Sequence, residues 1–179
     1  DVQYAWSDVE RALRTLQDWA DLDVFFIETP LQIDDLDGYA RLHHEAPMRV
    51  AAGEWQTTRF EFIDLMDRGL VDVAQPDVGR VGGLTEARRV CELAADRGRL
   101  IVPHCWKTGI GIAASAHLAA VTPHCPHIEF LPANLCDSDL RKELVADELR
   151  IENGVIPLPE KPGLGIELNL DALQRFKVG

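Results

Sequence analysis

The sequence lacks the features that mark several specialised classes of protein. No apolar run approaches the roughly 18 residues that a membrane-spanning helix needs, and no basic segment followed by an apolar stretch opens the chain. The four cysteines show no C-x-x-C spacing, in a chain too long to need disulfide staples. These absences predict a cytoplasmic protein with reduced thiols and no contact with a membrane.

Positive charge is also scarce. The chain has 18 Lys and Arg against 30 Asp and Glu, a formal net charge of −12 at pH 7. Such a charge disfavours binding to nucleic acid or to an anionic membrane. If the substrate is an anion, a bound cation would be one way to reverse the local field. Apolar residues, by contrast, make up 46% of the 179 residues, which is enough for a real buried core.

Short apolar runs recur along the chain, each followed by polar or glycine residues and then by a helical pattern. We expect strands to end in the runs 24–30, 48–54, 70–77, 99–104 and 127–132. Apolar residues at three- and four-residue spacing predict helices between them, most clearly over 84–97. Ser7 and Glu10 predict a capping box ahead of a first helix, and 137–148 is expected to form a late helix. This alternation predicts a parallel sheet or barrel.

An ionisable residue lies in the same phase at the end of every unit. The series is Asp1, Glu28, Glu54, Asp77, His104 and Glu129, 23 to 27 residues apart. In a barrel these positions converge on one mouth, where active sites of that fold lie, whereas an open sheet would spread them along an edge. We therefore predict the C-terminal portion of a TIM-type (β/α) barrel with about six β/α units.

Three carboxylates come first in this series: Asp1, Glu28 and Glu54. At one mouth they would repel each other, and without compensation at least one would be protonated. An all-oxygen ligand set with no histidine or thiolate favours Mg²⁺. Each acid taken alone is as readily explained as an ordinary surface carboxylate, so the metal site rests on their shared phase.

Asp77 and His104 come next, on neighbouring units. A carboxylate beside an imidazole fixes its tautomer and raises its basicity, as a general base requires. The alternative is a hydrogen-bonded core histidine and a helix-capping aspartate. Glu129 could protonate or hydrogen-bond a substrate oxygen, or be an ordinary acid at a strand end. Together the six residues predict removal of a proton α to a metal-bound carboxylate, with the resulting enediolate stabilised by Mg²⁺.

Seven motifs resemble, in order and spacing, the C-terminal barrel of the mandelate racemase/muconate lactonizing enzyme family of the enolase superfamily, whose metal-assisted sites are a known example of pKa tuning. They are DVQYAW, FFIETP, AAGEW, DVAQPDVGRVGGLTEARRV, VPHCWKTGIGIAASAHLAA, HIEFLP and PGLGIELN. The resemblance covers the chain to about Leu170. It implies Mg²⁺ ligands at Asp1, Glu28 and Glu54. It further implies a dyad of Asp77 and His104, and a Glu129 that hydrogen-bonds the substrate carboxylate.

The resemblance is closer to acid-sugar dehydratases than to racemases. It implies dehydration of an aldonate or aldarate, with racemisation or epimerisation of a 2-hydroxy acid as the alternative; a non-catalytic binding or regulatory protein is a further one. We also expect a homo-oligomer. The family's lysine motif and N-terminal capping domain have no counterpart here, so we expect 1–179 to be the C-terminal part of the barrel domain, with 150–179 packing against such a cap.

Two cysteine clusters suggest other chemistry. Cys105 beside His104 could be a nucleophile next to its base, but adjacent strand residues point to opposite faces. His124, Cys125 and His127 suggest a soft-metal site, yet they lack the paired spacing of structural zinc sites. We therefore expect a packing role for Cys105 and disfavour zinc at the second cluster. Trp106 and Lys107 follow in the loop and either contact substrate or pack at a helix start.

Overall fold

The protein, seen in a computed structural model that describes residues 1–106 and 108–178, alternates strands and helices as predicted. Four parallel strands form one sheet in sequence order, β1 (Phe26–Glu28), β2 (Arg49–Ala52), β3 (Val73–Ala74) and β4 (Leu100–Ile101). The helices of this part are α1 (Val9–Asp18), α2 (Leu36–Glu45), α3 (Arg59–Asp67), α4 (Leu84–Asp96) and α5 (Gly109–Ala120). The predicted α/β fold with a parallel sheet is confirmed.

Two further segments extend the sheet at its edges. Val2 N donates to Glu28 O at 3.2 Å beside β1, and Glu129 N donates to Pro103 O at 3.3 Å beyond β4. The prediction of a regular strand over 127–132 is wrong, because no strand is assigned to those residues. Pro126 and Pro132, which lack an N–H, border the segment and limit its pairing. The six ionisable residues nevertheless follow one another across the sheet in sequence order.

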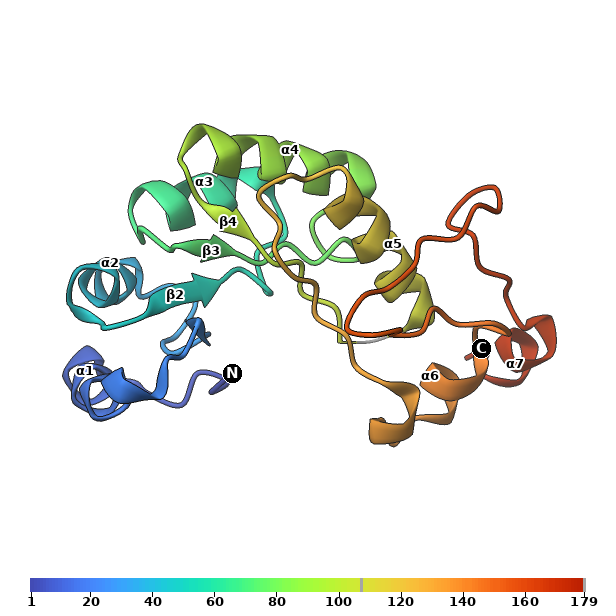
Figure 1. Ribbon diagram of the computed structural model, residues 1–179, viewed down its shortest axis with the longest axis horizontal. Helices are drawn as coiled ribbons and strands as arrows, with labels where there is room; N and C mark the ends of the chain where they lie inside the picture. The colour runs from blue at the N-terminus through green and yellow to red at the C-terminus, as the bar shows by residue number, and fades with distance from the viewer. Residues whose placement is uncertain (107, 179) are drawn as a thin grey trace.

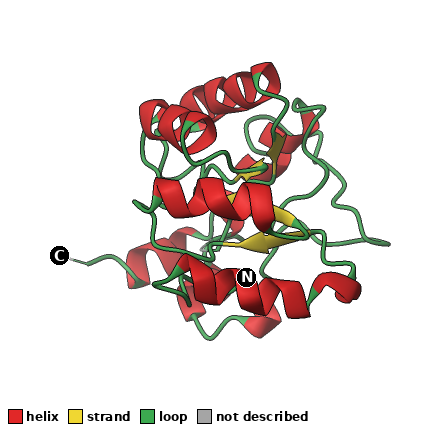
Figure 2. Ribbon diagram, turned by 90° about the vertical axis from the view of Figure 1, so that its left-hand side faces the viewer, coloured by secondary structure: helices red, strands yellow, loops and turns green. Residues whose placement is uncertain are grey.

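Both faces of the sheet carry buried apolar side chains. Helices α1 to α4 lie along its outer side, and the elements follow an arc (Figures 1 and 2). Most of the core lies between sheet and helices, around fully buried side chains such as Tyr39, Phe62 and Leu65. On the inner side Ala51, Val73 and Val102 form a second buried cluster. This double burial explains why the strands have few polar residues.

The N-terminal cap of α1 differs from the one predicted from the sequence. α1 is capped by Asp8, whose side chain accepts from Glu10 N at 3.0 Å, so the capping box predicted at Ser7 is not formed. The helix begins at Val9, and only the residue directly before it can reach its first free N–H groups. A complete capping box instead opens α3, where Thr58 and Glu61 bond each other's backbone.

The helices are short. The longest, α4, has 13 residues, and α5, rich in alanine and glycine, has 12. Over residues 1–106 and 108–178, no helix is both long enough and apolar enough to cross a bilayer.

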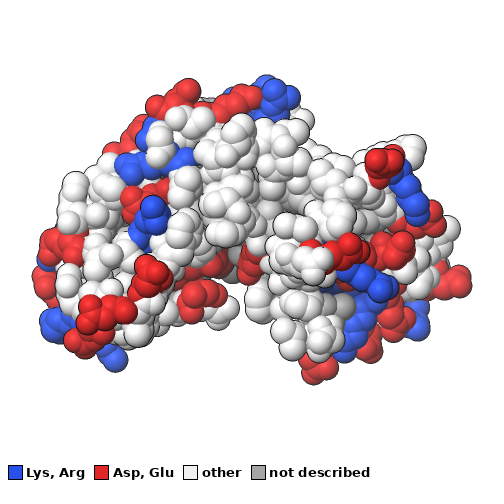
Figure 3. All heavy atoms as spheres, viewed as in Figure 1, with Lys and Arg blue, Asp and Glu red and all other residues white. Residues whose placement is uncertain are grey.

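Beyond residue 132 the chain forms a second group of short elements. The helix expected over 137–148 is confined to α6 (Asp139–Glu143), because Ala146 N turns away to bond Glu167 O at 2.9 Å. A last helix, α7 (Leu170–Arg175), follows. The molecular surface is hollowed between the α1–α2 side and the α6–α7 side (Figure 3).

Candidate active site

Asp77 and His104 form a buried polar contact at the carboxyl ends of the strands. Asp77 lies three residues beyond β3, and His104 lies three beyond β4. Nδ1 of His104 is 2.9 Å from Oδ2 of Asp77, and the residues are 5% and 9% exposed. Gly79 N donates to the other carboxylate oxygen at 2.7 Å. Asp77 is thereby fixed and orients the imidazole.

The second nitrogen of His104 faces two more acids. Nε2 lies 3.4 Å from Glu54 Oε2 and 3.8 Å from Glu129 Oε2. Burial favours a lower pKa for His104, but the hydrogen bond to Asp77 and the charges of Glu129 and Glu54 outweigh it and raise the pKa above its ordinary value. Burial favours a higher pKa for Asp77, yet its hydrogen bonds to His104 and Gly79 hold that pKa below the ordinary value. The pair therefore combines a carboxylate that stays ionised with a basic imidazole.

Asp1 and Glu54 are held by hydroxyl groups. Tyr4 donates to Glu54 Oε1 at 3.0 Å, and Thr29 donates to Asp1 Oδ1 at 2.9 Å. Burial raises the pKa of Tyr4, and the charge of Glu54 adds to the effect, so the phenol stays protonated as a donor. Both acids are thus oriented by hydrogen bonds at the end of the sheet that carries the dyad.

The pKa of Glu28 is raised by its burial and by the neighbouring carboxylates. Burial raises its pKa, and the charge of Glu129 adds to the effect, whereas a hydrogen bond from Gln75 lowers it. Gln75 is 1% exposed, and its Oε1 finds no hydrogen-bond partner among the residues that the structure describes. A cation at this position would offset the surplus negative charge.

The donor chemistry of Asp1, Glu28 and Glu54 fits a hard divalent cation, since all their ligand atoms are oxygens. In the part of the chain that the structure describes, however, no three Asp, Glu, His or Cys side chains already converge as a metal cluster. Thr29 and Tyr4 each bind one carboxylate oxygen, so the second oxygen of Asp1 and of Glu54 could bind the ion while these hydrogen bonds are kept. The site therefore fits Mg²⁺ by composition and charge, after side-chain rearrangement.

The backbone N–H of Cys105 binds the side chain of Glu129. Cys105 N donates to Glu129 Oε2 at 2.6 Å, which fixes that carboxylate near His104. The Cys105 side chain is 4% exposed, and burial raises its pKa to about 12. Its sulfur lies toward α5, 3.1 Å from where a Cβ on Gly111 would be. A neutral thiol packed against a helix is a poor nucleophile.

Several residues at the site were missed by the sequence analysis: Tyr4, Thr29, Gln75 and Arg80. Gln75 and Arg80 carried a usable signal, because they lie two residues before and three after Asp77 in the run QPDVGR. Tyr4 and Thr29 carried none, because their role depends on how the first segment lies against β1. Trp106 is 52% exposed, and Lys107 lies outside the described residues.

In the second cysteine cluster, the side chains of Cys125 and His124 contact backbone oxygens. Cys125 Sγ donates to His127 O at 3.1 Å, and His124 Nε2 lies 2.9 Å from Cys91 O. Within residues 1–106 and 108–178, neither these residues nor any others form a metal cluster.

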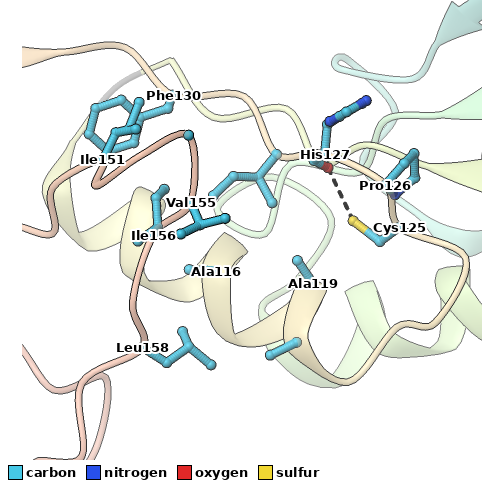
Figure 4. Close-up of a pocket in the computed structure, with 13 residues that line it drawn as sticks. Ala116, Ala119, Cys125, Pro126, His127, Phe130, Ile151, Val155, Ile156 and Leu158 are labelled. Atoms are coloured by element: carbon cyan, nitrogen blue, oxygen red, sulfur yellow. Dashed lines mark hydrogen bonds between the residues drawn. The ribbon is translucent and has the colours of Figure 1, made fainter.

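A hollow of about 450 Å³ lies away from the acids, between α5 and the C-terminal segment. Ala116 and Ala119 face Ile151, Val155 and Leu158 across it (Figure 4). None of the six ionisable residues of the predicted site lines this hollow. Its described lining is mostly apolar and includes His127 but no carboxylate, whereas the strand ends bring an imidazole and several carboxylates together.

Comparison with known proteins points to one family. The family model described as Enolase C-terminal domain-like matches residues 1–172. The D-galactarolactone cycloisomerase of Agrobacterium fabrum is 35% identical, over 89% of this chain and 43% of that protein. The arabinonate dehydratase of Saccharolobus solfataricus is 33% identical, over 94% and 44%.

A solved structure of the same superfamily has a similar fold. The crystal structure of L-talarate dehydratase from Polaromonas sp. JS666, complexed with Mg and L-glucarate, has a TM-score of 0.81 at 28% identity, covering 94% of this chain and 44% of that one. The chain thus spans less than half the length of these relatives. The family model, matched over residues 1–172, covers the strand ends that carry the six ionisable residues. This chain belongs to the Enolase C-terminal domain-like family, the mandelate racemase/muconate lactonizing enzyme group of the enolase superfamily.

Proposed function

We propose that this chain supplies the proton-transfer and Mg²⁺-binding side chains of an enzyme that removes the proton α to the carboxylate of an acid sugar, with dehydration as the outcome. The observation that carries the proposal is the buried His104, whose Nδ1 lies 2.9 Å from Asp77 while its Nε2 faces the acids. A general base needs this combination of fixed orientation and raised basicity.

Each side chain has a distinct part in the proposed reaction. His104 Nε2 takes the proton, and the Asp77 carboxylate stabilises the imidazolium that forms. Glu129, fixed by Cys105 N, hydrogen-bonds the substrate carboxylate. Asp1, Glu28 and Glu54 would hold Mg²⁺. When bound there, the ion supplies positive charge beside the substrate carboxylate, where negative charge develops as the proton leaves.

Two outcomes can follow the same first step. In dehydration the hydroxyl β to the former C–H bond leaves with a proton as water, giving an enol that becomes a 2-keto acid. In isomerisation all atoms are retained. The likeness to the arabinonate dehydratase supports the first outcome. The likeness to the D-galactarolactone cycloisomerase supports isomerisation as a class, and our alternative within that class is racemisation or epimerisation of a 2-hydroxy acid. Mass spectrometry separates them, because only dehydration makes the product lighter by one water.

The test is α-proton exchange. The intact protein is incubated with Mg²⁺ in D₂O and a library of aldonic and aldaric acids, and the α-proton signal is followed by NMR. His104→Asn should slow exchange by about 10²- to 10⁴-fold, the usual contribution of a general base. Mg²⁺ binding should be retained, because His104 is not one of the proposed ligands.

The matched control is Cys105→Ala, which should keep most of the activity because the neutral thiol only packs against α5. A folded Cys105→Ala as inactive as His104→Asn would assign the chemistry to the thiol. If the wild-type protein exchanged no α-proton of any acid in the library, the non-catalytic binding or regulatory alternative would replace this proposal.

A further inference from the structure

We propose that Arg80 is a positioning residue that ties the loop carrying Glu54 to the carboxylate of Asp77. This inference rests on the proposed function above. Arg80 Nη1 donates to the backbone oxygen of Glu54 at 2.7 Å, and its Nε lies 3.6 Å from Asp77 Oδ2. The same Oδ2 faces His104 Nδ1. One guanidinium thus links a proposed metal ligand to the residue that orients the base.

A third contact fixes the plane of this guanidinium. Its Cζ lies 4.1 Å from the centroid of the Trp55 ring, within the range of a cation–π interaction. The Arg80 side chain is only 15% exposed, which strengthens its contacts relative to those of a fully solvated arginine. A planar, delocalised cation can stack on a ring while one N–H donates to a carbonyl and its charge faces a carboxylate, an arrangement that a lysine ammonium does not reproduce.

The loop that carries Glu54 needs such support. β2 ends at Ala52, and Gly53, with φ of +133°, turns the chain away from the sheet. Gln56 N closes the turn on Gly53 O at 3.2 Å. Glu54 therefore lies on a turn and not in the strand ladder. Tyr4 holds its carboxylate and Arg80 holds its carbonyl.

The expected consequence is a loss of alignment with little loss of folding. Without Arg80, Glu54 can drift relative to Asp77 and His104. Residues that orient metal ligands commonly contribute 10- to 100-fold to metal affinity or activity. The effect should therefore appear in Mg²⁺ affinity and in kcat, more than in the KM for substrate.

The experiment compares Arg80→Met, Arg80→Lys and Glu54→Gln in the intact protein. Mg²⁺ alone is titrated by calorimetry, and α-proton exchange on the acid sugar that exchanges fastest gives kcat and KM. Arg80→Met should weaken Mg²⁺ binding by about 10- to 100-fold and lower kcat with a smaller change in KM. Arg80→Lys should recover part of the Mg²⁺ affinity and kcat. Its ammonium can donate to the Glu54 carbonyl, but it cannot at the same time stack on Trp55 and face Asp77 as the planar guanidinium does.

The matched control is Arg88→Met, because Arg88 pairs with Glu92 on the exposed face of α4, away from the predicted site. It should leave Mg²⁺ affinity and kcat unchanged. A folded Arg80→Met with wild-type Mg²⁺ affinity and kcat would overturn the proposal. If Arg80→Met does not fold, wild-type values in Arg80→Lys would overturn it equally. Unchanged Mg²⁺ affinity in Glu54→Gln would instead overturn the proposed metal site itself.

Discussion

His104 and Cys105 are neighbours in the chain, yet their surroundings give them opposite chemistry. Alternation along an extended backbone turns the imidazole toward Asp77 and the thiol toward α5. The sequence was enough to predict this division, because it follows from phase alone. It was not enough to predict Tyr4 and Thr29 as donors to Glu54 and Asp1. Their contacts join residues 50 and 28 positions apart, and no local pattern encodes such distances.

The buried thiol leads to a prediction about reactivity. Cys105 is 4% exposed with a pKa raised to about 12, whereas Cys136 is partly exposed. Iodoacetamide reacts with the thiolate, so at pH 8 Cys105 should be alkylated far more slowly than Cys136. Peptide mapping by mass spectrometry after timed quenching measures both rates. Denaturant should make the rates similar. Equal rates in the native protein would contradict the packing role of Cys105.

At the scale of elements, the positions of strands and helices were predicted from the sequence better than their lengths. The runs around β1, β2, β3 and β4 and the helix α4 were correctly located from apolar spacing. The strands are only two to four residues long, and 127–132 forms none. The length of a strand depends on how many backbone groups find partners on both sides, and that is a property of the assembled sheet. Likewise α6 ends early because 144–146 pair with 167–169.

The end of β2 gives a prediction about stability. A Cβ on Gly53 would lie 2.7 Å from Phe62 Cε1 and 3.0 Å from Gln75 N, in a backbone conformation at φ +133° that disfavours other residues. Gly53→Ala should therefore lower the free energy of unfolding by about 2 kcal/mol or more, measured by urea denaturation.

Gly98→Ala separates the two causes of that loss. Gly98 also has positive φ, +65°, but nothing lies within 4 Å of its added Cβ. It should cost only about 1 kcal/mol of backbone strain. An equal loss in both variants would mean that the contact with Phe62 and Gln75 relaxes freely.

At the scale of the whole molecule, Arg141 joins the C-terminal elements to the sheet. Its side chain, 1% exposed, pairs with Glu148 and donates to Leu131 O at 2.6 Å. Leu131 lies two residues after Glu129, so this contact also holds the last segment of the predicted site in place. From the sequence we predicted a late helix over 137–148, but no pattern in it indicated that Arg141 would be buried.

Removing that arginine would leave Glu148 without its partner. Arg141→Met should lower the free energy of unfolding by about 3 kcal/mol, because a largely buried charge is left uncompensated. Urea denaturation measures this loss, with Arg150→Met, at an exposed position nearby, as the matched control. A loss under about 1 kcal/mol would mean that Glu148 reaches water when Arg141 is removed.

The sequential order of the strands has a consequence for how the chain reaches this structure. Paired residues such as Phe26 and Arg49, Ala51 and Val73, or Val73 and Leu100 are 22 to 27 residues apart. Loop-closure entropy varies with the logarithm of that separation, so the three pairings differ by only about 0.2 kcal/mol. No strand pair has an entropic advantage as a folding nucleus. Which pair forms first must therefore be decided by side-chain packing of the helix between its strands.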